Sequence, residues 1–185
     1  FTTLLRSNKS GVKIKFQVSI RERPILPVFD APQLEQRYFR FLDFEPAPIS
    51  SLMVEEVIAE KIRAASQRSK IRDLYDLAEI SSRPLNKEMV RSLAVLKLWQ
   101  SGRVGLDFGR FRERIESGDE YDVRDLQNLL RRDQQPDLPA MIARVCSEFR
   151  FLDQLSETER ALANDSSHCL RKEAEAFRNE IAQGR

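Results

Sequence analysis

The stretch "VIAEKIRAASQRSKIRDLYDL", from Val57 to Leu77, places a lysine where a helical pattern would place a buried apolar residue. Lys61 follows Val57 by four residues, so it lies on the same inward face of a helix. An ammonium group is costly to remove from water alone, and it therefore needs an anionic partner. The apolar residues that define this face recur at helical spacing, at Val54, Val57, Ile58, Ile62 and Ala65.

The next predicted helix offers two carboxylates as partners for Lys61. Asp73 and Asp76 are three residues apart and therefore neighbours on one helical face. A short turn between the helices would bring Lys61 and an aspartate together in a cleft. The cations that would surround this pair are Arg63, Arg68, Lys70 and Arg72, and no acidic residue occurs between Lys61 and Arg72. Such a cluster of positive charge suits a polyphosphate.

A purely structural interpretation of the same residues stays open. Lysine stems often cover apolar surface while the amine reaches water, and Lys61 could do the same. Asp73 and Asp76 could equally be surface or helix-start residues.

The composition fits one globular domain, or one domain with a smaller appendage. The chain has 185 residues, of which 41% are hydrophobic, and a net charge of +2 that gives no global polybasic signal for nucleic acid. Two cysteines and one histidine argue against a structural zinc site and favour a reducing cytoplasm. No apolar run is long enough to span a membrane, so no membrane partner is expected.

The N-terminal part should contain a sheet. "GVKIKFQVSI", residues 11–20, alternates apolar and polar residues as a strand does. Prolines then mark an extended region up to about Ile49, which we expect Phe39, Phe41 and Phe44 to anchor on the core.

The rest of the chain should be helical, which gives an α+β fold. We expect Ser50 or Ser51 to cap the first helix. The boundary between the strand part and the helical bundle falls near residue 50, or near 84 if the Lys61 helix packs on the sheet; we adopt 1–84 and 85–185. Helices are expected over about 52–67, 71–81, 86–100, 110–117, 122–132, 137–153 and 156–181.

The motif "EEVIAEKIRAASQRSKIRDLYDL" resembles the paired motifs of the AbiEii/AbiGii-type toxin family. These are a Glu-x-x-Ala-x-Lys-x-x-Ala helix and an Arg-Asp-hydrophobic-Tyr-Asp-Leu helix. The strand "VKIKFQVSIRE" is similar to a family strand as well. The family consists of bacterial nucleotidyltransferase-like toxins of toxin–antitoxin and phage-defence systems. The resemblance implies the C-terminal part of a nucleotidyltransferase-like sheet followed by a helical bundle.

The resemblance also implies an activity and roles for particular residues. The activity would be nucleotidyl transfer from an NTP with Mg²⁺ to a tRNA end or a protein hydroxyl, in the cytoplasm and with a cognate antitoxin as partner. Lys61 would contact the triphosphate, and Asp76 would orient Lys61 or activate the acceptor. Arg72 would contact phosphate, Arg63 would join the nucleotide-binding residues, and Asp73 would hold Lys61 or Arg63 in place.

The chain departs from the family pattern where metal is bound. No Gly-Ser segment with an Asp-x-Asp pair is present, and Gln17 occupies the strand position of a third carboxylate, where it is a poor Mg²⁺ ligand. Because the chain starts at Phe1 without methionine, it could be a fragment, or the protein could lack the motif. We therefore expect no metal site in this chain and no activity of this chain alone. The alternative function is a non-catalytic remnant that binds nucleic acid or a partner through the Lys61–Arg72 basic patch.

Overall fold

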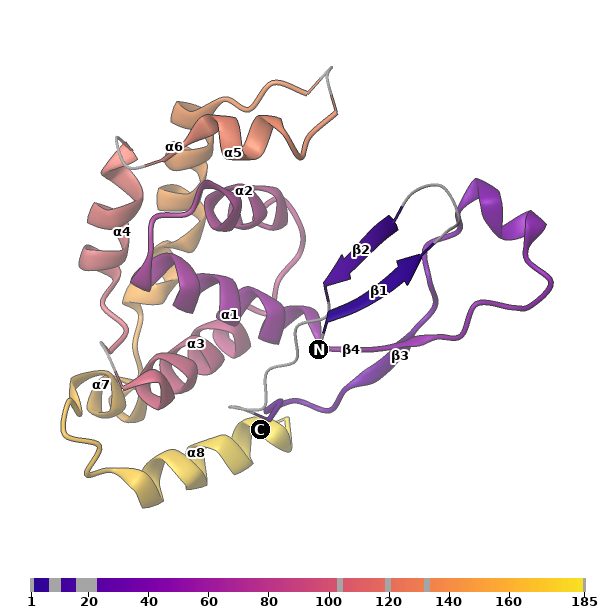
Figure 1. Cartoon of the computed structure of the whole chain (residues 1–185). Coiled ribbons are helices and arrows are strands. Elements are labelled where there is room, and N and C mark those ends of the chain that lie inside the picture. Colours follow the sequence, from indigo (N-terminus) through magenta and orange to yellow (C-terminus); the bar gives the residue numbers. More distant parts are fainter. Residues whose placement is uncertain are drawn as a thin grey trace.

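The chain combines a helical body with a smaller β-containing part that extends away from it (Figure 1). The computed structural model describes residues 2–6, 11–15, 23–102, 105–118, 121–131 and 134–184, the first two ranges as backbone alone. This mixed architecture agrees with the predicted α+β class.

The β-containing part has two antiparallel pairs of strands. β1 (Thr2–Arg6) pairs with β2 (Gly11–Lys15), and β3 (Phe29–Ala31) pairs with β4 (Ile49–Ser51). The predicted strand is confirmed over β2, whereas its continuation through Gln17 lies outside the described residues.

The segment between β3 and β4 does not pack as predicted. It contains a 3₁₀ helix at Arg37–Phe41, and the side chains of Phe41 and Phe44 are 75% and 62% exposed. The expectation that these two rings anchor the segment on the core is wrong. The segment projects away from the helical body (Figure 1), so no core surface is available to them.

Most predicted helices are present, although two have different limits. In place of the predicted helix over 122–132, the structure has a shorter one. The predicted helix over 156–181 is two helices, because the Asp165 carboxylate accepts hydrogen bonds from the backbone N–H groups of Cys169 and Leu170 and closes a turn there. The helices are α1 (Val54–Gln67), α2 (Ile71–Ile80), α3 (Lys87–Ser101), α4 (Phe108–Glu116), α5 (Val123–Gln127), α6 (Leu138–Glu148), α7 (Glu157–Asn164) and α8 (Arg171–Ala182), with a 3₁₀ turn at Phe149–Asp153.

The packing of α1 on α3 forms the centre of the core. Ile58 and Ile62 of α1 and Leu93 and Leu96 of α3 are fully buried, which is the largest source of stabilisation available to such helices. α2 lies beside α1 and also packs against α5 and α6 (Figure 1). Within the described ranges, the structure has no helix of a length and hydropathy that could cross a membrane.

The start of α1 differs from the prediction in its cap. The N-cap residue is Met53. The Ser51 hydroxyl donates a hydrogen bond to the carbonyl of Ile49 and does not accept one from a backbone N–H of the helix. The predicted serine cap is therefore wrong. Ser51 ends strand β4, and the chain needs two further residues to turn into the helix. Glu55 and Glu56 still occupy the first turn, where the helix dipole favours negative charge.

Candidate functional site

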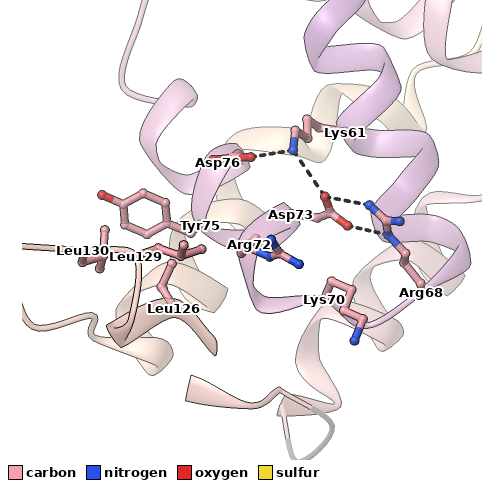
Figure 2. Close-up of a pocket in the computed structure, with 10 residues that line it drawn as sticks. All are labelled: Lys61, Arg68, Lys70, Arg72, Asp73, Tyr75, Asp76, Leu126, Leu129 and Leu130. Carbon is pink, nitrogen blue, oxygen red and sulfur yellow. Dashed lines mark hydrogen bonds and ion pairs between the residues drawn. The ribbon is translucent and has the colours of Figure 1, made fainter. Parts of the chain in front are cut away.

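A short connection between α1 and α2 brings the predicted partners together. Arg68 ends α1, Lys70 precedes α2, and Lys61 then faces the second helix. The Lys61 Nζ lies 2.6 Å from Asp76 Oδ2 and 3.4 Å from Asp73 Oδ1 (Figure 2). The predicted pairing of Lys61 with an aspartate of the next helix is confirmed.

The two carboxylates occupy different environments. The Asp73 side chain is only 3% exposed, and Arg68 donates to it through Nε at 2.8 Å and through the Nη2 group at 3.3 Å. Lys61 donates to the same carboxylate, so Asp73 links the two cations. The Asp76 side chain is 40% exposed. Asp73 therefore acts as a buried anchor, whereas Asp76 faces the open side of the site.

Lys61 keeps its positive charge in this environment. Partial burial by itself would lower the pKa of its ammonium group. The hydrogen bond and negative charge of Asp76, with the contribution of Asp73, outweigh burial and raise the pKa above its usual value. Lys61 therefore presents an ammonium group at neutral pH.

These residues lie at one side of a pocket with a volume of about 570 Å³. That size falls in the range typical of small-molecule sites. Figure 2 shows the ion-paired residues at one end of the pocket and a group of apolar side chains at the other. The lining residues are Lys61, Arg68, Lys70, Arg72, Asp73, Tyr75, Asp76, Leu126, Leu129 and Leu130.

Arg63 lies elsewhere, although the sequence grouped it with the nucleotide-binding residues. Its guanidinium donates to the Glu60 carboxylate at 2.6 and 2.9 Å, and it does not line the pocket. Asp73 consequently holds Lys61 and Arg68, and not Arg63. The structure therefore brings together Lys61, Arg72, Asp73 and Asp76 and leaves Arg63 outside.

Sequence reasoning missed a buried network behind the pocket. The Lys97 ammonium of α3 lies 2.9 Å from Glu56 Oε1 and 2.8 Å from Glu60 Oε1. The Glu56 carboxylate also accepts hydrogen bonds from the backbone N–H groups of Ile25 and Leu26, and the shortest N···O distance is 2.9 Å for each. The available signal was a single lysine inside the apolar run "LAVLKLW".

The charge on Glu60 is stabilised by the same network. Burial by itself would raise the pKa of the Glu60 carboxyl. The hydrogen bonds from Lys97 and Arg63, together with their positive charges, outweigh burial and lower the pKa below its usual value. Glu60 therefore remains a negatively charged carboxylate beside Lys97 and Arg63 at neutral pH.

Comparisons with known proteins identify the family and the fold of the chain. The model of the family described as nucleotidyl transferase AbiEii toxin, type IV TA system, matches residues 1–175. The solved structure of MenT4, a nucleotidyltransferase toxin from Mycobacterium tuberculosis H37Rv, is similar with a TM-score of 0.76 and 23% sequence identity. A search of the curated proteins found no match.

The likeness to MenT4 shows a shared fold and covers 97% of this chain but 63% of the MenT4 chain. This chain therefore spans less than two thirds of the length of that toxin. The family match does not depend on the MenT4 comparison. It extends over residues 1–175, which include both motifs at the pocket. The chain belongs to the AbiEii family of nucleotidyl transferase toxins of type IV toxin–antitoxin systems.

Proposed function

We propose that this chain contributes the triphosphate-binding half of a site that transfers a nucleotidyl group from an NTP to a hydroxyl of an RNA, such as a tRNA end, or of a protein. The observation that carries the proposal is the position of Lys61, which is charged, oriented by two carboxylates and located in a cationic pocket. Family membership supports nucleotidyl transfer as the reaction. The acceptor and the role of this chain as a partial catalytic unit are part of the proposal.

The roles of the residues follow from the chemistry of the reaction. The acceptor hydroxyl oxygen forms a bond to the α-phosphorus and gives up its proton to solvent, while the bond to the departing pyrophosphate breaks. Negative charge on the phosphoryl oxygens must be neutralised, and Lys61 with Arg72 would supply cations for them. Asp76 orients the Lys61 ammonium through their 2.6 Å contact, and Asp73 fixes Lys61 and Arg68 from the buried side.

Family nucleotidyl transfer normally involves Mg²⁺, and the described residues do not fit that ion. Mg²⁺ requires several oxygen ligands in octahedral geometry. The two carboxylates of the pocket are paired with Lys61 and Arg68. The described ranges contain no group of three or more His, Cys, Asp or Glu side chains that could hold a metal. No step is therefore assigned to a metal held by these residues.

We further propose the wider setting that the family implies. Residues 1–84 would form the nucleotidyltransferase-like part, in which α1, α2 and their connection carry the charged residues of the pocket, and 85–185 would form the bundle, which adds three leucines to it. A cognate antitoxin would accompany the toxin, because the family is described as part of a type IV toxin–antitoxin system. The reaction would take place in the cytoplasm, where NTPs and tRNA are available.

The test is transfer of label from radioactive NTPs in the presence of Mg²⁺ and total tRNA, using the protein at its natural full length. Lys61→Ala and Asp76→Asn should each reduce labelling by about 100-fold or more, since the first removes the cation at the reacting phosphate and the second removes the charged partner that orients this cation. Lys87→Ala is the control, because Lys87 is 54% exposed and lies outside the pocket. Equal labelling by the Lys61 and Asp76 variants and the wild type would refute the assignment.

A binding function without catalysis is the second candidate. Arg68, Lys70 and Arg72 are exposed along the pocket, and no carboxylate in the described part of the chain pairs with Lys70 or Arg72. Such cations suit a phosphate backbone. RNA affinity should then fall steeply with added salt and fall again in Arg68→Glu, without any labelled product. Salt-insensitive binding would exclude this function.

A further inference from the structure

The pocket has an apolar end that the phosphate-binding role does not use. Leu126, Leu129 and Leu130 come from α5 and the turn after it, and Tyr75 comes from α2 (Figure 2). Leu129 is 61% exposed, so it is accessible to a molecule in the pocket. We call these four residues the apolar wall.

Local structure explains how the apolar wall is formed. Asp122 caps α5 by accepting the N–H of Arg124, and the buried Leu126 anchors the helix on the core. The Leu126 carbonyl accepts the N–H groups of Leu129 and Leu130, at 2.9 and 3.1 Å. This turn holds two leucines beside the pocket, opposite the ion-paired residues.

Tyr75 joins the apolar wall to the charged end of the pocket. It precedes Asp76 on α2, so its ring lies on the adjoining helical face. Partial burial raises the pKa of its hydroxyl, and the charges of Glu79 and Asp76 raise it further. The ring therefore stays neutral at physiological pH, as a stacking surface with one hydrogen-bonding group.

We propose that the apolar wall binds the nucleobase of the NTP whose triphosphate lies against Lys61, Arg68 and Arg72. This inference rests on the proposed function. A nucleotide carries both chemistries that the pocket offers, a polyanion for the cations and a flat aromatic ring for Tyr75 and the leucines. Stacking on aromatic and apolar side chains is a general mode of base recognition, and it tolerates different bases.

The charge distribution favours a nucleotide over other occupants. Among the described residues, no carboxylate pairs with Lys70 or Arg72, so an apolar peptide would leave these two cations of the pocket without a counter-charge. Inorganic phosphate would leave the apolar wall exposed. The donor nucleotide is preferred to a base of the acceptor because the cationic and apolar surfaces line one continuous cavity of about 570 Å³.

The test compares NTPs with inorganic triphosphate, which has the same charged groups and no base. Each ligand is titrated calorimetrically into the wild-type chain, Leu129→Ser and Tyr75→Ala. Wild type should bind an NTP roughly tenfold or more tightly than inorganic triphosphate, as expected for one stacked base. Both variants should lose this preference and bind inorganic triphosphate as the wild type does.

Two further variants serve as controls. Leu34→Ser removes another exposed leucine, 85% exposed and outside the pocket, and should change neither affinity. Tyr75→Phe keeps the ring and should keep the preference for NTPs. Because Leu129 is mostly exposed, its serine variant should fold as the wild type does, which circular dichroism can verify.

The possible failures separate this inference from the proposed function. Equal affinity of wild type for NTP and inorganic triphosphate would overturn the base-binding role and leave the phosphate site intact. A weaker acceptor interaction in Leu129→Ser with unchanged NTP affinity would assign the wall to the acceptor and also overturn it. If neither ligand binds, the proposed function fails and this inference fails with it.

Discussion

Replacing Lys97 by methionine tests the buried network that holds α1 against α3. The Lys97 side chain is 3% exposed and contacts Glu56 and Glu60 at 2.9 and 2.8 Å. Methionine has a similar length but no charge, so the change removes the ion pairs and leaves little cavity. The Glu56 carboxylate, only 1% exposed, then loses its cation where water barely reaches, whereas the Glu60 carboxylate is 27% exposed and keeps some contact with water.

The magnitude follows from what remains after the substitution. Removing one member of a buried ion pair costs about 3–5 kcal/mol, because the other charge is left uncompensated. Glu56 keeps its N–H bonds from Ile25 and Leu26, and Glu60 keeps Arg63. We therefore expect a loss near the lower limit, about 3 kcal/mol. That is a large part of the 5–15 kcal/mol typical of a folded domain.

Urea denaturation followed by circular dichroism measures this loss, and Lys87→Met supplies the control. Lys87 lies on the same helix but is 54% exposed and 3.9 Å from Glu148, so its substitution should cost less than about 1 kcal/mol. A Lys97→Met variant that is as stable as Lys87→Met at neutral pH would refute the argument that the network is an energetically important buried pair.

The effect should also depend on pH in a defined direction. The pKa of Glu60 is lower in the folded state than its unfolded value of 4.5. Its contribution to the free energy of unfolding is therefore fully present above pH 4.5 and is lost as the pH falls through the pKa of the folded state. The stability difference between wild type and Lys97→Met should therefore narrow in acid. A difference that widens below pH 4.5 would contradict this sign.

Two further predictions concern α7 and the loops beside it. The pKa of the Asp165 carboxyl is lowered, chiefly by the hydrogen bond that it accepts from the backbone N–H of Leu170. A hydrogen bond from Trp99 Nε1, at 3.1 Å, lowers it further. The side-chain carboxyl resonance of Asp165, followed by NMR, should therefore titrate below the ordinary value of 3.8; a midpoint at or above that value would contradict this direction. Gly105→Ala should cost at least about 2 kcal/mol in thermal or urea unfolding, because a Cβ there would overlap the backbone carbonyl of Ala163 in α7. Gly109→Ala on the exposed face of α4 should cost less, because its Cβ would approach only the Asp107 Oδ1, at 3.2 Å; equal effects would contradict the close approach at Gly105.

Local pattern was sufficient to predict the helices of the site. The period of apolar residues predicted α1 over 52–67 and α2 over 71–81, close to the observed Val54–Gln67 and Ile71–Ile80. The predicted inward face was only partly correct, because Val54 is 45% exposed and the Lys61 side chain is 31% exposed. The short connection made the pairing of Lys61 with Asp73 and Asp76 predictable. These features depend on neighbours along the chain, which a single sequence displays.

Features that depend on distant neighbours were missed or wrong. Phe41 and Phe44 are as apolar as any core residue, and only the projection of their segment from the body leaves them exposed. Lys97 meets Glu56 only because α3 packs on α1. The placement of Arg63 could have been predicted, since two residues along a helix correspond to about 200°, which points it away from Lys61.

The buried network and the pocket are two sides of the same helix, and this connects stability to function. Glu56 and Glu60 are four residues apart, so both face α3, where Lys97 binds them. Lys61 is one residue further, about 100° around the helix, and therefore faces α2. The contacts to Lys97 thus fix the rotation of α1 about its axis, and that rotation determines whether the Lys61 ammonium reaches Asp76. A change in the network that leaves the chain folded should consequently weaken the polyphosphate binding that we propose for the pocket, although Glu56, Glu60 and Lys97 do not line it.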